Sequence, residues 1–150
     1  YGLFTTVSKP CRPGENKEFG IRCVVDNSKI SRGDRTLFPE ISNKFRDQGI
    51  HAFKKGNYTQ AAELFKKATE ANKNDPEVRI YYNNALAHQQ GSPFTFAVVI
   101  PIDSISISNG QEILRGVATA QQKFNNEQFN QQNQGSNARL LEIVIANDGN

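Results

Sequence analysis

The stretch that decides the fold is GIHAFKKGNYTQAAELFKKATEANKNDP, which spans residues 49–76. Small and apolar residues recur there at steps of three and four, which predicts two helices that pack against each other. Gly56 suits the left-handed position that follows a helix, and Asn57 suits the cap that begins the next one. Residues 72–75 are polar and are expected to end the second helix. We therefore expect a close-packed helical hairpin, a unit that serves binding rather than catalysis.

A third helix is expected directly after this hairpin. Pro76 stands where the first turn of a helix tolerates proline, and Glu77 follows it. The apolar side of this helix is expected to carry Val78, Tyr81, Tyr82, Ala85 and Leu86. Residues 90–93 read Gln-Gly-Ser-Pro, which stops a helix and forms a short linker. The helical part is therefore expected to occupy residues 41–91.

Residues 49–68 resemble a tetratricopeptide repeat, whose period is about 34 residues. The residues that match its helix contact, its turn and its small-large-small ladder are Gly49, Gly56, Tyr58, Ala61, Phe65 and Ala68. The third helix resembles the first half of a following repeat, which gives about one and a half repeats where a free-standing array needs about three. The resemblance implies a protein partner bound through the helices, and a hairpin that takes part of its stability from a neighbouring domain or subunit.

The remainder of the chain changes to the pattern of a parallel sheet. Residues 94–102 are almost continuously apolar, so we expect a strand that is buried on both faces. Residues 110–124 have a helical period, and residues 140–146 form a second apolar run. The inner side of the helix is expected to carry Ile113, Val117, Ala120 and Phe124. The order strand, helix, strand predicts one parallel β-α-β unit.

Two further expectations concern this β-α-β unit. Residues 125–137 are rich in Gln and Asn, and we interpret them as a solvated surface loop between the helix and the second strand. A lone β-α-β unit also leaves both edges of its sheet open, and we therefore expect it to be poorly stable by itself.

The unit resembles the opening of the type I periplasmic substrate-binding proteins, the branched-chain amino acid receptor family. The matching segments are FAVVIPID at 96–103, QEILRGVATAQQKFN at 111–125 and LLEIVIANDGN at 140–150. With the preceding repeat and a cysteine pair, the chain looks like the cyanobacterial receptors that join these parts behind a membrane anchor. The resemblance implies the fold class α + α/β, in which a tetratricopeptide-like hairpin and a third helix precede a truncated periplasmic-binding-protein domain at residues 92–150.

Residues 1–40 are rich in turn-forming residues and contain the only two cysteines, Cys11 and Cys23. The loop between them is flexible enough to close, and a disulfide there would stabilise the chain by about 3 kcal/mol in an oxidising compartment. A metal site would need CxxC spacing and further ligands, and two reduced thiols are the remaining alternative. We expect an irregular extracytoplasmic stalk pinned by this disulfide, with at most a short strand at residues 20–25.

The sequence contains no apolar run of 18 or more residues, so no span of a membrane is expected within it. The apolar start at residues 1–4 fits either the tail of a membrane anchor upstream or an ordinary N-terminus, and we favour the anchor. The net charge is only +3, and the lysines fall on expected solvent faces of helices. A nucleic-acid partner is therefore not expected.

The sequence has no catalytic constellation, so we expect no enzyme activity, no cofactor and no metal. His51 and His88 are isolated on expected helices, and no phosphate-binding or hydrolase motif occurs. Ligands of open α/β sheets lie at the carboxyl ends of the strands. Polar side chains expected at that rim are Asp103, Ser104, Ser106, Ser108 and Asp148. Ordinary loop polarity is the alternative interpretation of each.

Two functions follow from these observations. The first is a fragment of a solute-binding receptor, which in the complete protein captures an amino acid or amide by closure of two lobes and serves an ABC permease or a signalling partner. Later strands, absent from this sequence, would supply most of the ligand contacts. The second is a protein-interaction adaptor in which the helices are the working surface and residues 94–150 cap them.

Overall fold

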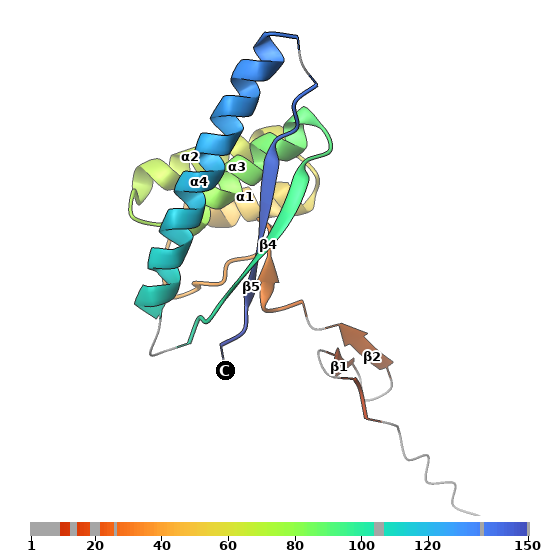
Figure 1. The fold of residues 1–150 in the computed structure, drawn as a ribbon. Helices are drawn as coiled ribbons and strands as arrows, with labels where there is room; N and C mark the ends of the chain where they lie inside the picture. Colours follow the sequence, from red (N-terminus) through yellow and green to blue (C-terminus); the bar gives the residue numbers. More distant parts are fainter. Residues whose placement is uncertain are drawn as a thin grey trace, which may run out of the picture.

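Figure 1 shows the computed structural model of the 150-residue chain, which describes residues 10–12, 15–18, 22–25, 27–103, 107–135 and 137–149. These residues form a mixed α and β protein with four helices and two small sheets. In chain order the elements are β1 (Glu15–Glu18), β2 (Arg22–Val25), β3 (Ile30–Ser31), α1 (Lys44–Lys54), α2 (Tyr58–Ala71), α3 (Pro76–Gln90), β4 (Phe94–Ile100), α4 (Ile107–Asn133) and β5 (Leu141–Asn147).

The first two helices form the hairpin that the sequence predicts. The side chains of Asn43 and Asn57 cap α1 and α2 by accepting a hydrogen bond from a backbone N–H three residues further on. Gly56 has a φ of 73°, in the left-handed region that favours glycine. A Cβ atom at position 49 would lie 2.6 Å from the Cδ1 atom of the Phe65 ring. Gly49 is therefore the residue that allows α1 and α2 to approach.

The three-stranded sheet has the order β3-β5-β4, and its main pair is parallel. Phe94 of β4 lies opposite Leu141 of β5, and the register continues to Ile100 opposite Asn147. α4 connects the two strands, which confirms the predicted β-α-β order. β3 runs antiparallel to β5, with Ile30 opposite Ala146.

α4 is longer than predicted and buries a different side. It continues to Asn133, so the interpretation of residues 125–137 as a loop is wrong for most of that range. Ile113 is 46 % exposed, and the predicted inner stripe is displaced by one residue. The residues of α4 that are buried are Gly110, Leu114, Ala118, Gln121 and Asn125. Two of these are polar amides that bond to β5, which the apolar period alone does not reveal.

The two strands of the parallel pair differ sharply in burial. Residues 141–145 of β5 are all buried, as predicted for a strand covered on both faces. β4 is exposed over most of its length, with Phe96 64 % and Val99 60 % exposed, so the same prediction is wrong for β4. The reason is position, because β4 is the last strand of the sheet and α4 packs mainly over α3 and β5.

Residues 27–41, which we call the strap, fold against the helices and the sheet. β3 lies within the strap and pairs with β5, and Phe38 is 1 % exposed in the core. The Glu77 carboxylate of α3 accepts hydrogen bonds from Thr36 Oγ1 at 2.6 Å and from the Leu37 backbone N–H at 2.7 Å. The strap therefore differs from the irregular stalk that composition predicts for residues 1–40.

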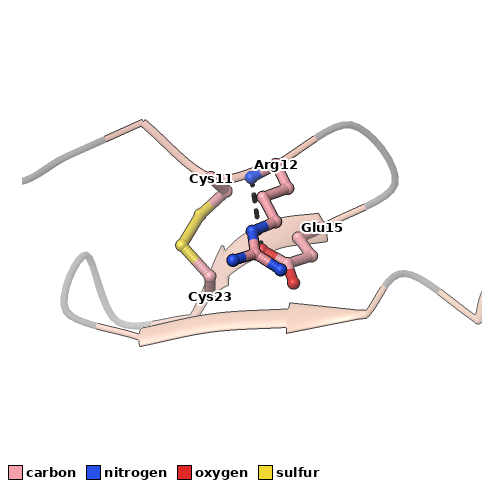
Figure 2. Close-up of a disulfide and its surroundings, with 4 residues drawn as sticks. All are labelled: Cys11, Arg12, Glu15 and Cys23. Atoms are coloured by element: carbon pink, nitrogen blue, oxygen red, sulfur yellow. Dashed lines mark hydrogen bonds between the residues drawn. A yellow bond between two sulfur atoms is a disulfide. The ribbon is translucent and has the colours of Figure 1, made fainter.

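Before the strap, the described strands β1 and β2 form a small hairpin apart from the main body in Figure 1. β1 and β2 pair antiparallel, with Glu18 opposite Arg22. Figure 2 shows the disulfide between Cys11 and Cys23, whose Cα atoms are 5.5 Å apart, so the predicted pairing is present. Residues 20 and 21 of the predicted strand lie outside the described residues, and β2 accounts for the rest.

One hydrophobic core joins the helical part to the β-α-β unit. Phe65 and Tyr81 of the helices belong to the same buried cluster as Ile100, Leu114 and Ile145 of the unit. Residues 41–91 and 92–150 are thus distinct in sequence pattern but share their interior.

None of the helices that the structure describes combines the length and the apolar character needed to cross a membrane. Residues 1–4, for which the sequence left a membrane anchor open, lie outside the described part of the chain.

Candidate functional site

The loops that follow β4 and β5 meet at one end of the sheet, where the sequence places a ligand rim. The Asn147 side chain joins them, because its Oδ1 accepts hydrogen bonds from the backbone N–H groups of Ile102 and Gly149, both at 2.8 Å. Its Nδ2 donates to the Ile102 carbonyl at 3.0 Å. A Cβ atom at position 149 would lie 2.8 Å from the Ile102 backbone, so glycine is required for this approach.

Only some of the predicted rim residues lie within the part of the chain that the structure describes. Asp103 is half-buried at the end of the first loop, and Ser108 is exposed in the first turn of α4. Asp148 is exposed, and its backbone N–H donates to the Ile100 carbonyl at 3.1 Å. Ser104 and Ser106 lie outside the described residues. The structure therefore brings the two loops to one end of the sheet, as expected.

Lys29 of the strap also reaches this rim, which sequence reasoning missed. Its Nζ donates to the Gly149 carbonyl at 2.9 Å, although 120 residues separate the two in the chain. No local sequence pattern predicts this contact, because it forms only when β3, which follows Lys29, pairs with β5.

The residues that carry the repeat resemblance pack as one group. Ala61, Phe65 and Ala68 are fully buried along α2. Tyr58 packs edge-on against Phe53, with ring centroids 5.1 Å apart. It also stacks on the His88 ring of α3 at 4.7 Å. The hairpin is thereby fixed to α3 through aromatic contacts.

A buried carboxylate joins α3, the strap and the sheet. Glu142 of β5 is completely buried, and its Oε2 contacts Nε2 of His88. Arg32 of the strap lies 3.4 Å from Oε1, and the Thr95 hydroxyl donates to the same oxygen at 3.3 Å. His88, which the sequence leaves as an isolated residue, is thus placed by a partner 54 residues away.

Side-chain amides bond to the side of β5 that faces away from β4. Asn84 of α3 accepts a hydrogen bond from the Ile143 backbone N–H at 2.9 Å and donates to the Ile143 carbonyl at 2.8 Å. Asn125 of α4 forms the same pair of bonds with Leu141, at 2.7 and 3.2 Å. Each amide therefore bonds the strand as a neighbouring peptide group would. The predicted open edge of β5 is closed in the described residues.

Ionisable groups cluster beneath the strap at the start of α3. Burial raises the pKa of Glu77 to about 7, although hydrogen bonds from Thr36 and Leu37 act to lower it. Burial also raises the pKa of Asp75, the residue that caps α3. The pKa of Tyr81 lies well above 10, because its hydroxyl is buried and Glu77 is near.

Two hollows on the described surface lie on the helices, away from the rim. One of about 660 Å³ lies on α1 and α2, and its lining includes Asp47, His51, Lys55 and Leu64. Another of about 300 Å³ lies between α2, α3 and α4, and its lining includes Glu70, Lys73, Arg79 and Tyr82. Both have charged walls, which suits a polar protein surface or peptide better than an apolar ligand.

Among the described residues, one group has the spacing of metal ligands: Cys11, Glu15 and Cys23. The two sulfur atoms are joined to each other, so they are not thiolates that could bind an ion. Comparisons of the chain with family models, with curated proteins and with solved structures found no match.

Proposed function

We propose that the chain is part of an extracytoplasmic solute-binding receptor of an ABC transporter, with its helices as a docking module for a protein partner. The observation that carries the proposal is the parallel β4–β5 pair with its α4 crossover. Asn147 holds the two following loops together at the carboxyl ends of these strands. That is where open α/β sheets bind ligands.

The chemistry of the rim supports a small zwitterionic or amide ligand. Asp103 and Asp148 bring carboxylates to this end of the sheet, and these would attract an amino group. The Ser108 hydroxyl in the first turn of α4 can donate a hydrogen bond to a ligand oxygen. In this proposal further strands supply the remaining contacts, as the family resemblance implies.

The disulfide supports an extracytoplasmic location. Disulfides form and persist in oxidising compartments and are rare in the cytosol. The Cys11–Cys23 bridge closes a hairpin that has only two four-residue strands. Residues 10–25 would have little else to hold them together in a reducing environment.

The proposal is tested by titration calorimetry of the full-length protein with a panel of amino acids and their amides. We expect heat of binding with at least one member of the panel. The Asp148→Asn variant should weaken that binding about tenfold or more, because it removes a charge facing the ligand amino group. Glu127→Gln, at an exposed position of α4, is the matched control and should bind as the wild type does. Absence of heat across the panel would contradict the receptor.

A protein-interaction adaptor is the second candidate, and the shared core favours it. The sheet packs on the helices through the cluster of Phe65, Tyr81 and Ile145, and Asn84 bonds directly to β5. Residues 94–150 would then serve as a cap for an incomplete repeat array. The reading frame beyond residue 150 separates the two candidates, because the receptor requires further alternating strands and helices and the adaptor requires none.

A further inference from the structure

The strap consists of two parts that different contacts hold to the body of the protein. Phe38 is 1 % exposed within the core, and the Arg46 side chain of α1 donates to its carbonyl at 3.3 Å. Residues 29–37, which we call the latch, contain two large apolar side chains. Ile30 is 39 % exposed and Leu37 is half-buried. The latch therefore buries little apolar surface, whereas the residue that follows it is fixed in the core.

Polar contacts with α3 hold the middle and the end of the latch. The Tyr81 hydroxyl lies 2.6 Å from Ser31 Oγ and 2.8 Å from the carbonyl oxygen of Arg35. At the end of the latch, the Glu77 carboxylate accepts the two hydrogen bonds from residues 36–37. Segments with few buried apolar contacts open at a lower free energy than a hydrophobic core. The latch is therefore the described part of the strap that we expect to open first.

The beginning of the latch forms one border of the rim. The Lys29 carbonyl accepts a hydrogen bond from the Asn147 backbone N–H at 2.8 Å, and its Nζ donates to the Gly149 carbonyl at 2.9 Å. The hairpin of β1 and β2, which precedes the strap, lies apart from the main body in Figure 1. The described contacts that hold this end of the latch are thus those with β5 and the loop after it.

Glu77 is the ionisable group on which the end of the latch rests. It is completely buried, and the described ion pair of Arg46 is with Asp47 rather than with Glu77. Burial raises the pKa of Glu77 to about 7, and the hydrogen bonds from the strap act to lower it. The charge of Asp75 raises this pKa and the charge of Arg46 lowers it. The Tyr81 hydroxyl is a further ionisable group beside Glu77 on α3. An ionised Glu77 under the latch is therefore a costly buried charge.

We propose that the latch lifts from α3 and β5, about a hinge at Phe38, when Glu77 loses its proton. Water reaches the carboxylate beneath an open latch, so its charge costs less there than under the closed latch. With the proton in place the latch stays bonded. The Thr36 hydroxyl can then accept a hydrogen bond from the carboxyl, while the Leu37 N–H still donates to the other oxygen. Opening also releases Lys29 from the rim.

The direction of this effect follows from the linkage between proton binding and opening. The closed latch binds a proton at Glu77 more tightly than the open latch, in which the carboxyl has its ordinary pKa of 4.5. Closure is favoured fully below pH 4.5, and this preference is lost as pH rises through 7. The open fraction should increase about twentyfold between pH 5.5 and 7.5. The inference requires no ligand, so it does not rest on the receptor proposal.

Native-state hydrogen exchange of the full chain tests the latch. The reporters are the backbone N–H groups of Leu37 and Asn147, which bond at its two ends, and the reference is the N–H of Phe65 within α2. We expect the opening that exposes the two reporters to be at least about a hundredfold more populated than the one that exposes Phe65. Low concentrations of guanidinium should leave it unchanged, because a local opening exposes little surface. The protection factors of the reporters should fall about twentyfold between pH 5.5 and 7.5.

Three variants separate the titrating group from the other contacts. Glu77→Gln should abolish the twentyfold change, since glutamine does not titrate. Tyr81→Phe removes the hydroxyl that holds the middle of the latch, and it should lower the protection of both reporters at either pH. Glu63→Gln is the matched control, because it removes a carboxylate at an exposed position of α2. It should exchange as the wild type does.

Several results would overturn the proposal. Reporters that exchange only together with Phe65 would mean that the strap opens by unfolding of the whole protein. Protection that is the same at both pH values, or a Glu77→Gln variant that keeps the wild-type change, would remove Glu77 as the group that controls opening. An unchanged Tyr81→Phe variant would mean that the latch is not released as one unit.

Discussion

The α1–α2 hairpin and the junction between α3 and β5 are held together by different chemistry. In the hairpin an apolar ring fills the space above a glycine, and Ala61, Phe65 and Ala68 are fully buried. At the junction the contacts are polar, with the amide of Asn84 and the carboxylate of Glu142 both completely buried. The periodicity of apolar residues in a sequence predicts apolar packing. A buried hydrogen bond can be predicted only when the partner of the polar group is known.

Truncation in the hairpin should have the largest effect on stability. Phe65→Ala removes a ring that fills the space above Gly49 and contacts Phe53 and Tyr81. We expect the free energy of unfolding to fall by about 3–5 kcal/mol, because a cavity replaces a buried aromatic side chain. Chemical denaturation followed by circular dichroism measures the loss. A loss below about 1 kcal/mol would show that the hairpin does not depend on this contact.

Removal of the amide at the junction should have a somewhat smaller effect. Asn84→Leu preserves the volume but leaves the N–H and C=O groups of Ile143 without partners. Each of these two unpaired buried groups costs about 1–3 kcal/mol, and the apolar burial of the leucine side chain offsets part of the sum, so we expect a loss of about 2–4 kcal/mol. The Ile143 amide should also lose protection from hydrogen exchange.

Asn126→Leu is the control for this substitution, because the same change is made at an exposed position of α4. It should alter the free energy of unfolding by less than about 0.5 kcal/mol. Equal losses in the two variants would mean that the junction does not rest on the amide bonds.

The pH dependence of stability should reveal a third, smaller contribution to the free energy of unfolding, which comes from the Glu77 carboxyl beneath the strap. Glu77 has a pKa of about 7 in the folded protein and 4.5 as its ordinary value. Between these values the folded state binds more protons than the unfolded state, so the stability that Glu77 contributes is fully present below pH 4.5 and is lost as pH rises through 7. We expect a loss of about 2 kcal/mol between pH 5.5 and 7.5.

Glu77→Gln should reduce this slope, since glutamine has the same shape and does not titrate. The measurement is the free energy of unfolding at several pH values for both proteins. The two proteins differ only at position 77, so the difference between their slopes reports the Glu77 carboxyl. Identical slopes would remove Glu77 as the cause.

Sequence reasoning was accurate where local chemistry controls the structure. The hairpin, its caps, the third helix, the parallel order of the two apolar strands and the Cys11–Cys23 disulfide all follow from patterns within short segments. The ends of the helices agree because Gly56 and Asn57 act through their own backbone or their immediate neighbours. The meeting of the loops after β4 and β5 was predicted for a related reason, since parallel strands end on the same side.

The same reasoning failed where burial depends on position in the sheet. β4 and β5 are both largely apolar in sequence, yet β5 lies in the middle of the sheet and β4 at its edge. The inner side of α4 was misjudged because Gln121 and Asn125 are buried, and polar residues at those positions ordinarily indicate solvent. Their carbonyl and N–H partners on Leu141 are visible only once the helix lies on the strand.

The order of the elements from α1 to β5 was thus determined by the sequence alone, because periodicity, capping and turn chemistry act over a few residues. Only the tertiary structure decided which of those elements are covered. It brought the strap beside β5, the amide of Asn84 onto a strand edge and Lys29 to the rim. The physical reason is that a buried polar group is stable only with a partner, and the partner of the buried Asn84 lies 59 residues away in the sequence. The exposed Lys29 likewise bonds to a carbonyl 120 residues away.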